Sequence, residues 1–210
     1  MAQKILVIGG VALGPKAACR CKRLMPDAEI TLVDENLFIS YGGCGIPYFV
    51  GGDVEKVEGL RATSAGVIRT PEFFHDLRDV DVQLGTRALK INRREKTVTV
   101  EDVATGQTRD IAYDKLVIAT GSTPRVPPIP GHDLENVPAV PCIEAAQAVQ
   151  QRCAARSISS AVIVGAGFIG LEMAVALADQ WGIKTTVIEL LPQVLPAQIS
   201  PNLAHMAQHD

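Results

Sequence analysis

One arrangement of residues occurs twice in this chain, and Gly165 repeats the position of Gly9 after 156 residues. In each copy a short apolar run leads into a glycine-rich turn, a helical stretch follows, and a second apolar run ends in an acidic residue. The first copy spans residues 4–35 and the second spans residues 161–189. Strand, glycine turn, helix and strand in this order are typical of a parallel βαβ unit. The repeat therefore predicts two such units in one chain.

The second copy has the complete glycine pattern of a dinucleotide-binding turn. Backbone N–H groups of such a turn approach a pyrophosphate, and the N-terminus of the next helix adds the favourable end of its dipole. An acidic residue at the end of the second strand accepts hydrogen bonds from ribose hydroxyls. No Arg or Lys directly follows this acid to meet a 2′-phosphate, which favours NADH over NADPH. The residues expected to contact the nucleotide are Gly165, Gly167, Phe168, Ile169, Gly170 and Glu189.

The first copy departs from the pattern at its middle glycine, where Val11 stands, but it keeps Gly9, Gly14 and Asp34. A single match of this kind also occurs as an ordinary tight turn in α/β domains. Two copies, each with an acidic partner at the end of the second strand, favour nucleotide binding at both turns.

Composition excludes several classes of protein. The chain has 210 residues, 47% hydrophobic and 20% charged, which is enough apolar material for a packed core. A net charge of -3 lacks the basic excess of a nucleic-acid-binding protein. The longest apolar stretch, residues 161–171, is shorter than the roughly 18 residues needed to cross a membrane. We therefore expect a soluble cytoplasmic protein without nucleic-acid or membrane partners.

The five cysteines form no CxxC pair, and their number is odd. This count fits neither a secreted disulfide framework nor a zinc site, so no metal site is expected.

The region between the two copies has a different pattern. Residues 80–100 and 107–117 alternate between apolar and polar side chains, which predicts an antiparallel β meander. Residues 114–121 indicate a buried strand that ends in a tight turn, and a proline-rich linker follows. Residues 143–156 are rich in Ala and Gln and predict a helix that leads to the second copy.

The predicted fold class is α/β, with two Rossmann-like dinucleotide-binding units built on parallel sheets and an antiparallel β meander. We place the domain boundary near residue 150, so that residues 1–150 and 151–210 form the two domains. On a prior of roughly 150 residues per domain, this length corresponds to one and a half domains. Too few residues follow Glu189 to complete a second nucleotide-binding sheet. We therefore expect the second unit to be incomplete, with an unpaired apolar edge that lowers solubility or pairs with another chain.

The helix predicted over residues 15–25 has two different faces. A period of 3.6 residues places Ala17, Ala18, Cys21, Leu24 and Met25 on one face, which should pack on the sheet. The opposite face carries Lys16, Cys19, Arg20 and Arg23. The pattern alone leaves two interpretations open: a solvated helix surface, or an anion-binding ridge beside the nucleotide turn.

Cys44 lies in a segment, residues 38–52, where glycines flank it on both sides. The glycines leave room for a cofactor or substrate to approach the sulfur. If a helix begins at Ile46, the sulfur lies near a helix N-terminus, where a thiolate is stabilised. The alternative is that Cys44 is only a small residue in a glycine-rich loop.

Together these segments resemble the flavoprotein disulfide reductases, and in particular their single-cysteine branch. The branch holds CoA-disulfide reductases, persulfide or polysulfide reductases, NADH oxidases and NADH peroxidases. The resemblance covers essentially the whole chain in order. The residues that carry it are 9–14 with Asp34, 40–48 around Cys44, 70–73, 113–121, 129–131 and 165–172.

The resemblance implies that FAD binds at the first glycine turn and NADH at the second. Hydride would pass from NADH to the flavin, and electrons from the flavin to Cys44. Without a second cysteine in a CxxxxC pair, the oxidised form would be a mixed disulfide with a substrate thiol or a sulfenic acid. The residues that the resemblance assigns to FAD are Gly9, Gly10, Val11, Ala12, Gly14, Asp34, Glu35, Val82, Ala119, Thr120 and Gly121.

Differences within the branch favour a reductase of CoA-disulfide, persulfide or polysulfide substrates. Oxidases and peroxidases of the branch have a His where this chain has Ala12, whereas Pro47 and Tyr48 resemble the CoA-disulfide and persulfide members. Two departures keep the substrate open: Gly43 stands where Asn is frequent, and Phe73 stands where some members have Lys. The residues that the resemblance assigns to a thiol or disulfide substrate, possibly CoA-linked, are Lys16, Arg20, Arg23, Ser40 and Gly43.

Two alternatives remain: an NADH oxidase or peroxidase that uses a sulfenic Cys44, and a non-catalytic nucleotide-binding fragment. The resemblance implies that the full-length enzyme is a homodimer built through a C-terminal domain. It also implies that this chain is the N-terminal part of such an enzyme.

Overall fold

The structure, a computed structural model, describes residues 2–208. The chain forms two compact units. The first unit contains the residues up to Gly43 together with Arg61–Arg125, and the second contains Cys44–Leu60 together with the residues from Val126 onward. Among the described residues, no helix is long and apolar enough to cross a membrane. The assignment of residues 1–150 and 151–210 to two different nucleotides remains a prediction.

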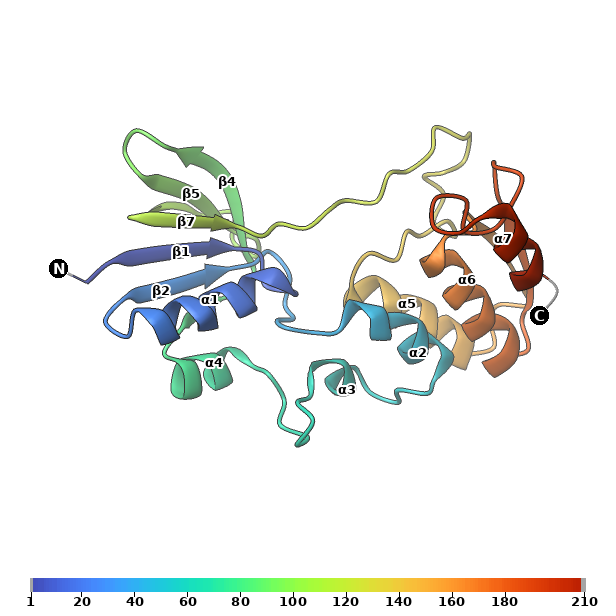
Figure 1. Ribbon diagram of the computed structural model, residues 1–210, viewed down its shortest axis with the longest axis horizontal. Helices are drawn as coiled ribbons and strands as arrows, with labels where there is room; N and C mark the ends of the chain where they lie inside the picture. The colour runs from blue at the N-terminus through green and yellow to red at the C-terminus, as the bar shows by residue number, and fades with distance from the viewer. Residues whose placement is uncertain (1, 209–210) are drawn as a thin grey trace. The chain divides into compact units, whose positions relative to one another are not determined.

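A four-stranded parallel sheet forms the centre of the first unit (Figure 1). Its strand order is β3-β2-β1-β7. β1 lies between β2 and β7, with Val7 paired to Leu32 on one side and to Val117 on the other. The bounds are β1 (Lys4–Ile8), β2 (Glu29–Val33), β3 (Asp81–Gln83) and β7 (Lys115–Ile118).

Both faces of this sheet are covered, which explains why β1 is a continuous apolar run. Ile5 and Val7 face one cluster with Ala18 of helix α1 (Leu13–Leu24) and Phe74 of helix α4 (Pro71–Arg78). The alternate side chains of β1 face a second cluster. That cluster contains Leu6, Ile8, Val33, Val98 and Val100.

The second cluster includes the antiparallel meander, which has the strand order β4-β5-β6. Its strands are β4 (Thr86–Asn92), β5 (Thr97–Asp102) and β6 (Thr108–Ala112). The predicted meander is confirmed for β4, β5 and β6, but the prediction was wrong for β3 and for residues 115–117, which belong to β7 and pair in parallel with β1. Val82 pairs with Leu32 in parallel and extends the first sheet, because a strand of three residues has too little pattern to show which partner it will take.

Two further expectations for the first unit were wrong. Leu24 and Met25 do not pack on the sheet: they are 63% and 36% exposed, because α1 ends at Leu24 and its buried face is Gly14, Pro15 and Ala18. The strand over residues 114–121 is β7, and it is half-buried rather than buried because it forms an edge of the sheet.

The second unit contains a two-stranded parallel sheet of β8 (Ser160–Val164) and β9 (Lys184–Ile188). Helix α6 (Phe168–Val175) connects them and continues into a π-helical segment, η2 (Ala176–Gln180). The two predicted parallel βαβ arrangements are thereby confirmed. The remaining helical elements are η1 (Gly43–Gly45), α2 (Ile46–Gly51), α3 (Val57–Arg61), α5 (Ile143–Ala154) and α7 (Pro201–Ala207).

In both βαβ arrangements the helix touches the turn at a glycine. A Cβ placed on Gly14 would lie 1.7 Å from the carbonyl oxygen of Gly9, and one on Gly170 would lie 2.0 Å from that of Gly165. Neither carbonyl can move freely, because each belongs to the turn that ends its strand. Glycine is therefore required at both positions for the helix to start where it does.

We expect Gly14→Ala to destabilise the first unit by about 3 kcal/mol, because its methyl group would overlap backbone. Urea denaturation followed by circular dichroism measures this change. Gly43→Ala is the matched control, since a Cβ there meets nothing within 4 Å, and it should change stability by less than about 0.5 kcal/mol. Equal stability of the two variants would contradict the proposed close contact.

Candidate functional site

The first glycine turn lies where the carboxyl ends of β1, β2 and β7 meet. The Gly9 amide donates a hydrogen bond to the carbonyl of Val33 at 2.9 Å, and the Ala119 amide donates to that of Ile8 at 2.7 Å. Gly9 has φ of +110°, and a Cβ there would overlap the Ala119 carbonyl. In open parallel sheets, ligands bind outside this edge of the strands. The structure thus brings the turn and residues 119–121 together, as the sequence suggested.

Asp34 fixes the shape of this turn from inside. It is only 7% exposed, and its Oδ2 accepts a hydrogen bond from the Gly10 amide. Its Oδ1 accepts from the backbone amide of Asn36 at 2.8 Å and from the side-chain amide at 2.9 Å. These three donors satisfy much of the carboxylate's capacity, so Asp34 has a clear structural task. Its contact with a ribose remains a prediction.

The second glycine turn repeats this arrangement. The Ala166 amide donates to Oε2 of Glu189 at 2.8 Å, and the Leu191 amide donates to Oε1 at 3.0 Å. The Gly165 amide bonds to the carbonyl of Ile188 at 2.7 Å, as Gly9 does in the first turn. The hydrogen bond from Leu191, followed by that from Ala166, lowers the pKa of Glu189 because both stabilise the carboxylate.

The outer side of the second turn is open. A Cβ on Gly165 or on Gly167 would meet nothing within 4 Å. Phe168 and Ile169 follow at the start of α6 and are 57% and 71% exposed, although both are large and apolar. Leu190, directly after Glu189, is 96% exposed. A polar ligand lying over this turn would therefore find free backbone and an apolar surface rather than packed side chains.

The other residues assigned to the first nucleotide are more scattered. Ala12 is exposed at the start of α1, and Val11 beside it is half-buried. Glu35 points to the meander, where its carboxylate pairs with Arg87 at 2.7 Å. Val82 is half-buried in β3 and packs against the core. The remaining two, Thr120 and Gly121, are exposed directly after Ala119.

Ser40 is tied to the first turn by backbone hydrogen bonds. Its amide donates to the Gly10 carbonyl at 2.8 Å, and its own carbonyl accepts from Nη1 of Arg69 at 2.8 Å. Ser40 has φ of +53°, a left-handed conformation that is uncommon for a residue with a side chain. The segment that leads to Cys44 is thus anchored on the first glycine turn. Arg69 was not found from the sequence, because no local pattern marks a partner 29 residues away.

Cys44 is exposed in the single turn η1, directly before α2. The helix from Ile46, which the sequence left only as a condition, is present as α2. Its two glycine neighbours have different tasks. A Cβ on Gly45 would lie 2.6 Å from Cδ2 of Leu60, so this glycine allows close packing, whereas the space around Gly43 is open. The thiol of Cys44 therefore lies in an exposed turn that is packed against Leu60 at Gly45 and is open at Gly43.

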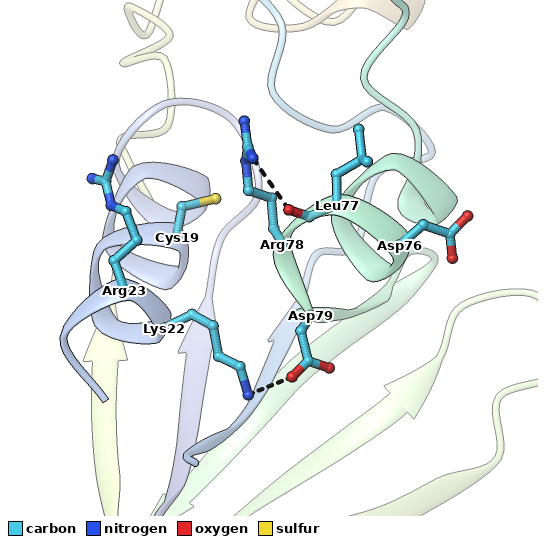
Figure 2. A pocket seen from close by; sticks show the side chains of 7 residues that line it. All are labelled: Cys19, Lys22, Arg23, Asp76, Leu77, Arg78 and Asp79. Carbon is cyan, nitrogen blue, oxygen red and sulfur yellow. Dashed lines mark hydrogen bonds and ion pairs between the residues drawn. The ribbon is translucent and has the colours of Figure 1, made fainter. Parts of the chain in front are cut away.

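A groove of about 410 Å³ separates α1 from α4 in the first unit (Figure 2). Lys22 forms an ion pair with Asp79 across it at 2.6 Å, and the guanidinium carbon of Arg78 lies over Phe73, 5.7 Å from the ring centroid. The full lining is Cys19, Lys22, Arg23, Asp76, Leu77, Arg78 and Asp79.

The groove changes the interpretation of Cys19. Sequence periodicity placed it among charges with no obvious partner, yet it is half-buried against the core and faces the groove. Burial raises the pKa of its thiol, and the nearby Arg78 and Arg23 only partly oppose that effect. Lys16 and Arg20 lie exposed on the same helix as Arg23. Arg78 was missed from the sequence, since it belongs to another helix.

The chain was compared with known proteins. Residues 3–210 match the family model described as pyridine nucleotide-disulphide oxidoreductase. The NAD-dependent persulfide reductase from A. fulgidus is 40% identical, with a TM-score of 0.93, covering 99% of this chain and 38% of that one. Reduced Bacillus anthracis CoADR-RHD is 33% identical, with a TM-score of 0.88, covering 100% and 37%.

An NADH oxidase from Methanocaldococcus jannaschii is 31% identical over 98% of this chain and 44% of its own length. The chain thus spans about two fifths of the length of these relatives. The sequence resemblance to this family is confirmed.

The lowered pKa of Glu189 predicts a specific pH dependence. Above its ordinary value of 4.5 the carboxylate is ionised and holds both amides, and these bonds are lost only as the pH falls through the lowered pKa. In NMR spectra, the amide signals of Ala166 and Leu191 should titrate together with a midpoint below 4.5. Glu189→Gln should remove this titration. A midpoint at or above 4.5 would contradict the observed hydrogen bonding.

Proposed function

Because the chain belongs to the pyridine nucleotide-disulphide oxidoreductase family, we propose that it serves in the FAD- and NADH-dependent reduction of CoA-disulfide, persulfide or polysulfide substrates. Cys44 is the redox nucleophile in this proposal. The observation that carries it is an exposed thiol between two glycines, in a chain whose two glycine turns are each held by a carboxylate.

The geometry of both turns fits a dinucleotide. In each, the turn follows a parallel strand and opens a helix, so backbone N–H groups and the helix N-terminus can receive a pyrophosphate. We assign FAD to the first turn and NADH to the second. The absence of a cation at Leu190 and Leu191 favours NADH over NADPH. When bound, NADH would supply the two electrons that a disulfide reduction needs, and FAD would pass them on.

The proposed step at Cys44 is thiol–disulfide exchange. Its thiolate attacks one sulfur of the substrate, a new S–S bond forms at Cys44, the original S–S bond breaks, and one substrate thiolate leaves. Two electrons and the required protons then release the second thiol and restore Cys44. The exposure of Cys44 and the open space around Gly43 allow the in-line approach that exchange requires.

A cationic surface supports an anionic substrate. Lys16, Arg20 and Arg23 lie along α1, and Arg78 adds a guanidinium from α4 across the groove. Guanidinium groups bind phosphate well because their N–H donors form charge-assisted pairs with its oxygens. The phosphates of a CoA-linked substrate match this surface, and the similar A. fulgidus and B. anthracis proteins carry persulfide reductase and CoADR names.

NADH oxidation with a sulfenic Cys44 is a second candidate, because one of the similar proteins is named NADH oxidase. Ala12 is a reason to rank it lower, since its methyl group offers no proton at the start of α1. Treatment with peroxide followed by a sulfenic-acid trap distinguishes the two: rapid, stoichiometric trapping at Cys44 would favour the oxidase.

Cys44 should form a mixed disulfide with CoA when the chain is mixed with CoA disulfide, because the exchange step needs no cofactor. Peptide mass spectrometry locates the adduct. We expect it on Cys44 and not on Cys153, which is 2% exposed. Cys44→Ser should abolish it. An adduct that survives this substitution, or that forms first elsewhere, would contradict the assignment.

Arg23→Ala and Arg78→Ala should each weaken the binding of CoA to the first unit by about tenfold in a calorimetric titration, the scale of a charge-assisted contact with phosphate. The rate at which Cys44 reacts with the uncharged disulfide of 2-mercaptoethanol should stay unchanged. Arg94→Ala, which removes an exposed arginine in the turn between β4 and β5, is the charge-matched control. Equal effects of all three substitutions would indicate only a loss of net charge.

A further inference from the structure

Helix α2, which begins directly after the turn of Cys44, has only six residues. An isolated helix of this length is not stable in water, so its order depends on packing against the rest of the protein. Its last carbonyl groups also need partners from outside the helix. The Gly52 amide returns to the carbonyls of Tyr48 and Phe49, but this leaves the carbonyl of Val50 to be satisfied.

The residue that satisfies this carbonyl lies directly after η2. Nε1 of Trp181 donates to the Val50 carbonyl at 2.7 Å, across 131 residues of sequence. Trp181 is the only tryptophan of the chain. Its hydrogen bond caps the C-terminal end of the helix that directly follows the turn of Cys44.

Close packing strengthens the same contact. A Cβ placed on Gly51 would lie 3.3 Å from Cγ of Gln180 and 3.4 Å from Cβ of Ala176, so α2 and η2 are in close contact at this glycine. Ala176 is itself 7% exposed. The end of α2 is therefore held on two sides by one short segment, Ala176–Trp181.

This segment is continuous with the nucleotide turn. α6 starts after Gly167 and runs without interruption into η2, whose π-helical bonding widens the last turn before Trp181. π-helical turns are rare within helices and are frequent at functional sites. One continuous helical stretch thus begins at the second glycine turn and ends at the residues that contact α2.

We propose that Trp181 is a positioning residue for Cys44. Its hydrogen bond to Val50, with the packing of η2 against Gly51, holds α2 and thereby the turn that presents the thiol. This inference rests on the proposed function only for the role of Cys44 as nucleophile. The orientation of Cys44 is fixed in this account by the same helix that forms the second nucleotide turn.

Trp181→Phe tests the proposal, because it keeps a ring and removes the N–H. We expect iodoacetamide to alkylate Cys44 about three- to tenfold more slowly in this variant, the factor that matches one net hydrogen bond. A freed α2 would let the turn of Cys44 leave the exposed conformation in which the thiol now stands, so that the reagent would reach it less often. Peptide mass spectrometry over about pH 6–9, which brackets ordinary thiol ionisation, gives the rate profile of each cysteine. Cys153 should keep its profile, whereas general loosening would speed its alkylation.

Gly51→Ala is the second variant and perturbs the same contact from the side of α2, without removing the hydrogen-bonding groups. It should slow Cys44 in the same direction. Thr185→Val is the matched control: it removes a side-chain hydrogen bond to the Ile183 carbonyl, 3.0 Å long, in the same unit but away from α2.

Unchanged Cys44 profiles in both Trp181→Phe and Gly51→Ala, or an equal change in Thr185→Val, would overturn the positioning role. The result is independent of the reaction proposed above. A slower Cys44 in the variants, together with no CoA adduct in the unaltered chain, would refute the proposed function and leave the positioning role standing.

Discussion

The hydrogen bond from a backbone amide of each glycine turn to the acid that ends the next strand is the interaction on which the candidate site depends. In the first unit Gly10 bonds to Asp34, and in the second Ala166 bonds to Glu189. The bond joins the ends of two neighbouring parallel strands and sets the path of the turn between them. A charged acceptor makes it stronger than an ordinary backbone bond. The helix can then start only where Gly14 or Gly170 allows it to touch the turn.

This constraint explains how the sequence could predict so much of the fold. Strand, turn and acid lie within residues 4–35 and within residues 161–189, so both βαβ arrangements were visible in the local pattern, as was the meander of β4, β5 and β6. The resemblance then placed the chain in the correct family. Where local pattern was short, it failed: the three residues of β3 joined the parallel sheet rather than the meander.

Other features could not be found because their partners are distant in sequence. Arg69 binds the Ser40 carbonyl, Arg78 faces Arg23 across a groove, and Trp181 caps a helix 131 residues earlier. None belongs to a repeating pattern, and each is selected by packing between elements. A period of 3.6 residues placed Leu24 and Met25 on the buried face of α1. Both are exposed, because the helix ends at Leu24 and its periodicity holds only within it.

Each unit contributes parts that the proposed thiol chemistry needs. Two similar turns are each held by an internal carboxylate, a cationic surface lies along α1, and an exposed thiol precedes a short helix that depends on distant contacts for its order. Rigid parallel sheets carry the two glycine turns proposed to bind nucleotides, whereas the groups proposed to meet a substrate lie in the turn of Cys44 and along α1. This division is common in enzymes, because a stable scaffold can position reactive groups on its loops.

The two glycine turns are proposed to bind two different dinucleotides. Calorimetric titration of the chain with FAD and with NADH, each alone and then in the presence of the other, decides between one site and two. One equivalent of each should bind, with no competition between them. Competition for a single site, or the absence of binding by both, would contradict this proposal.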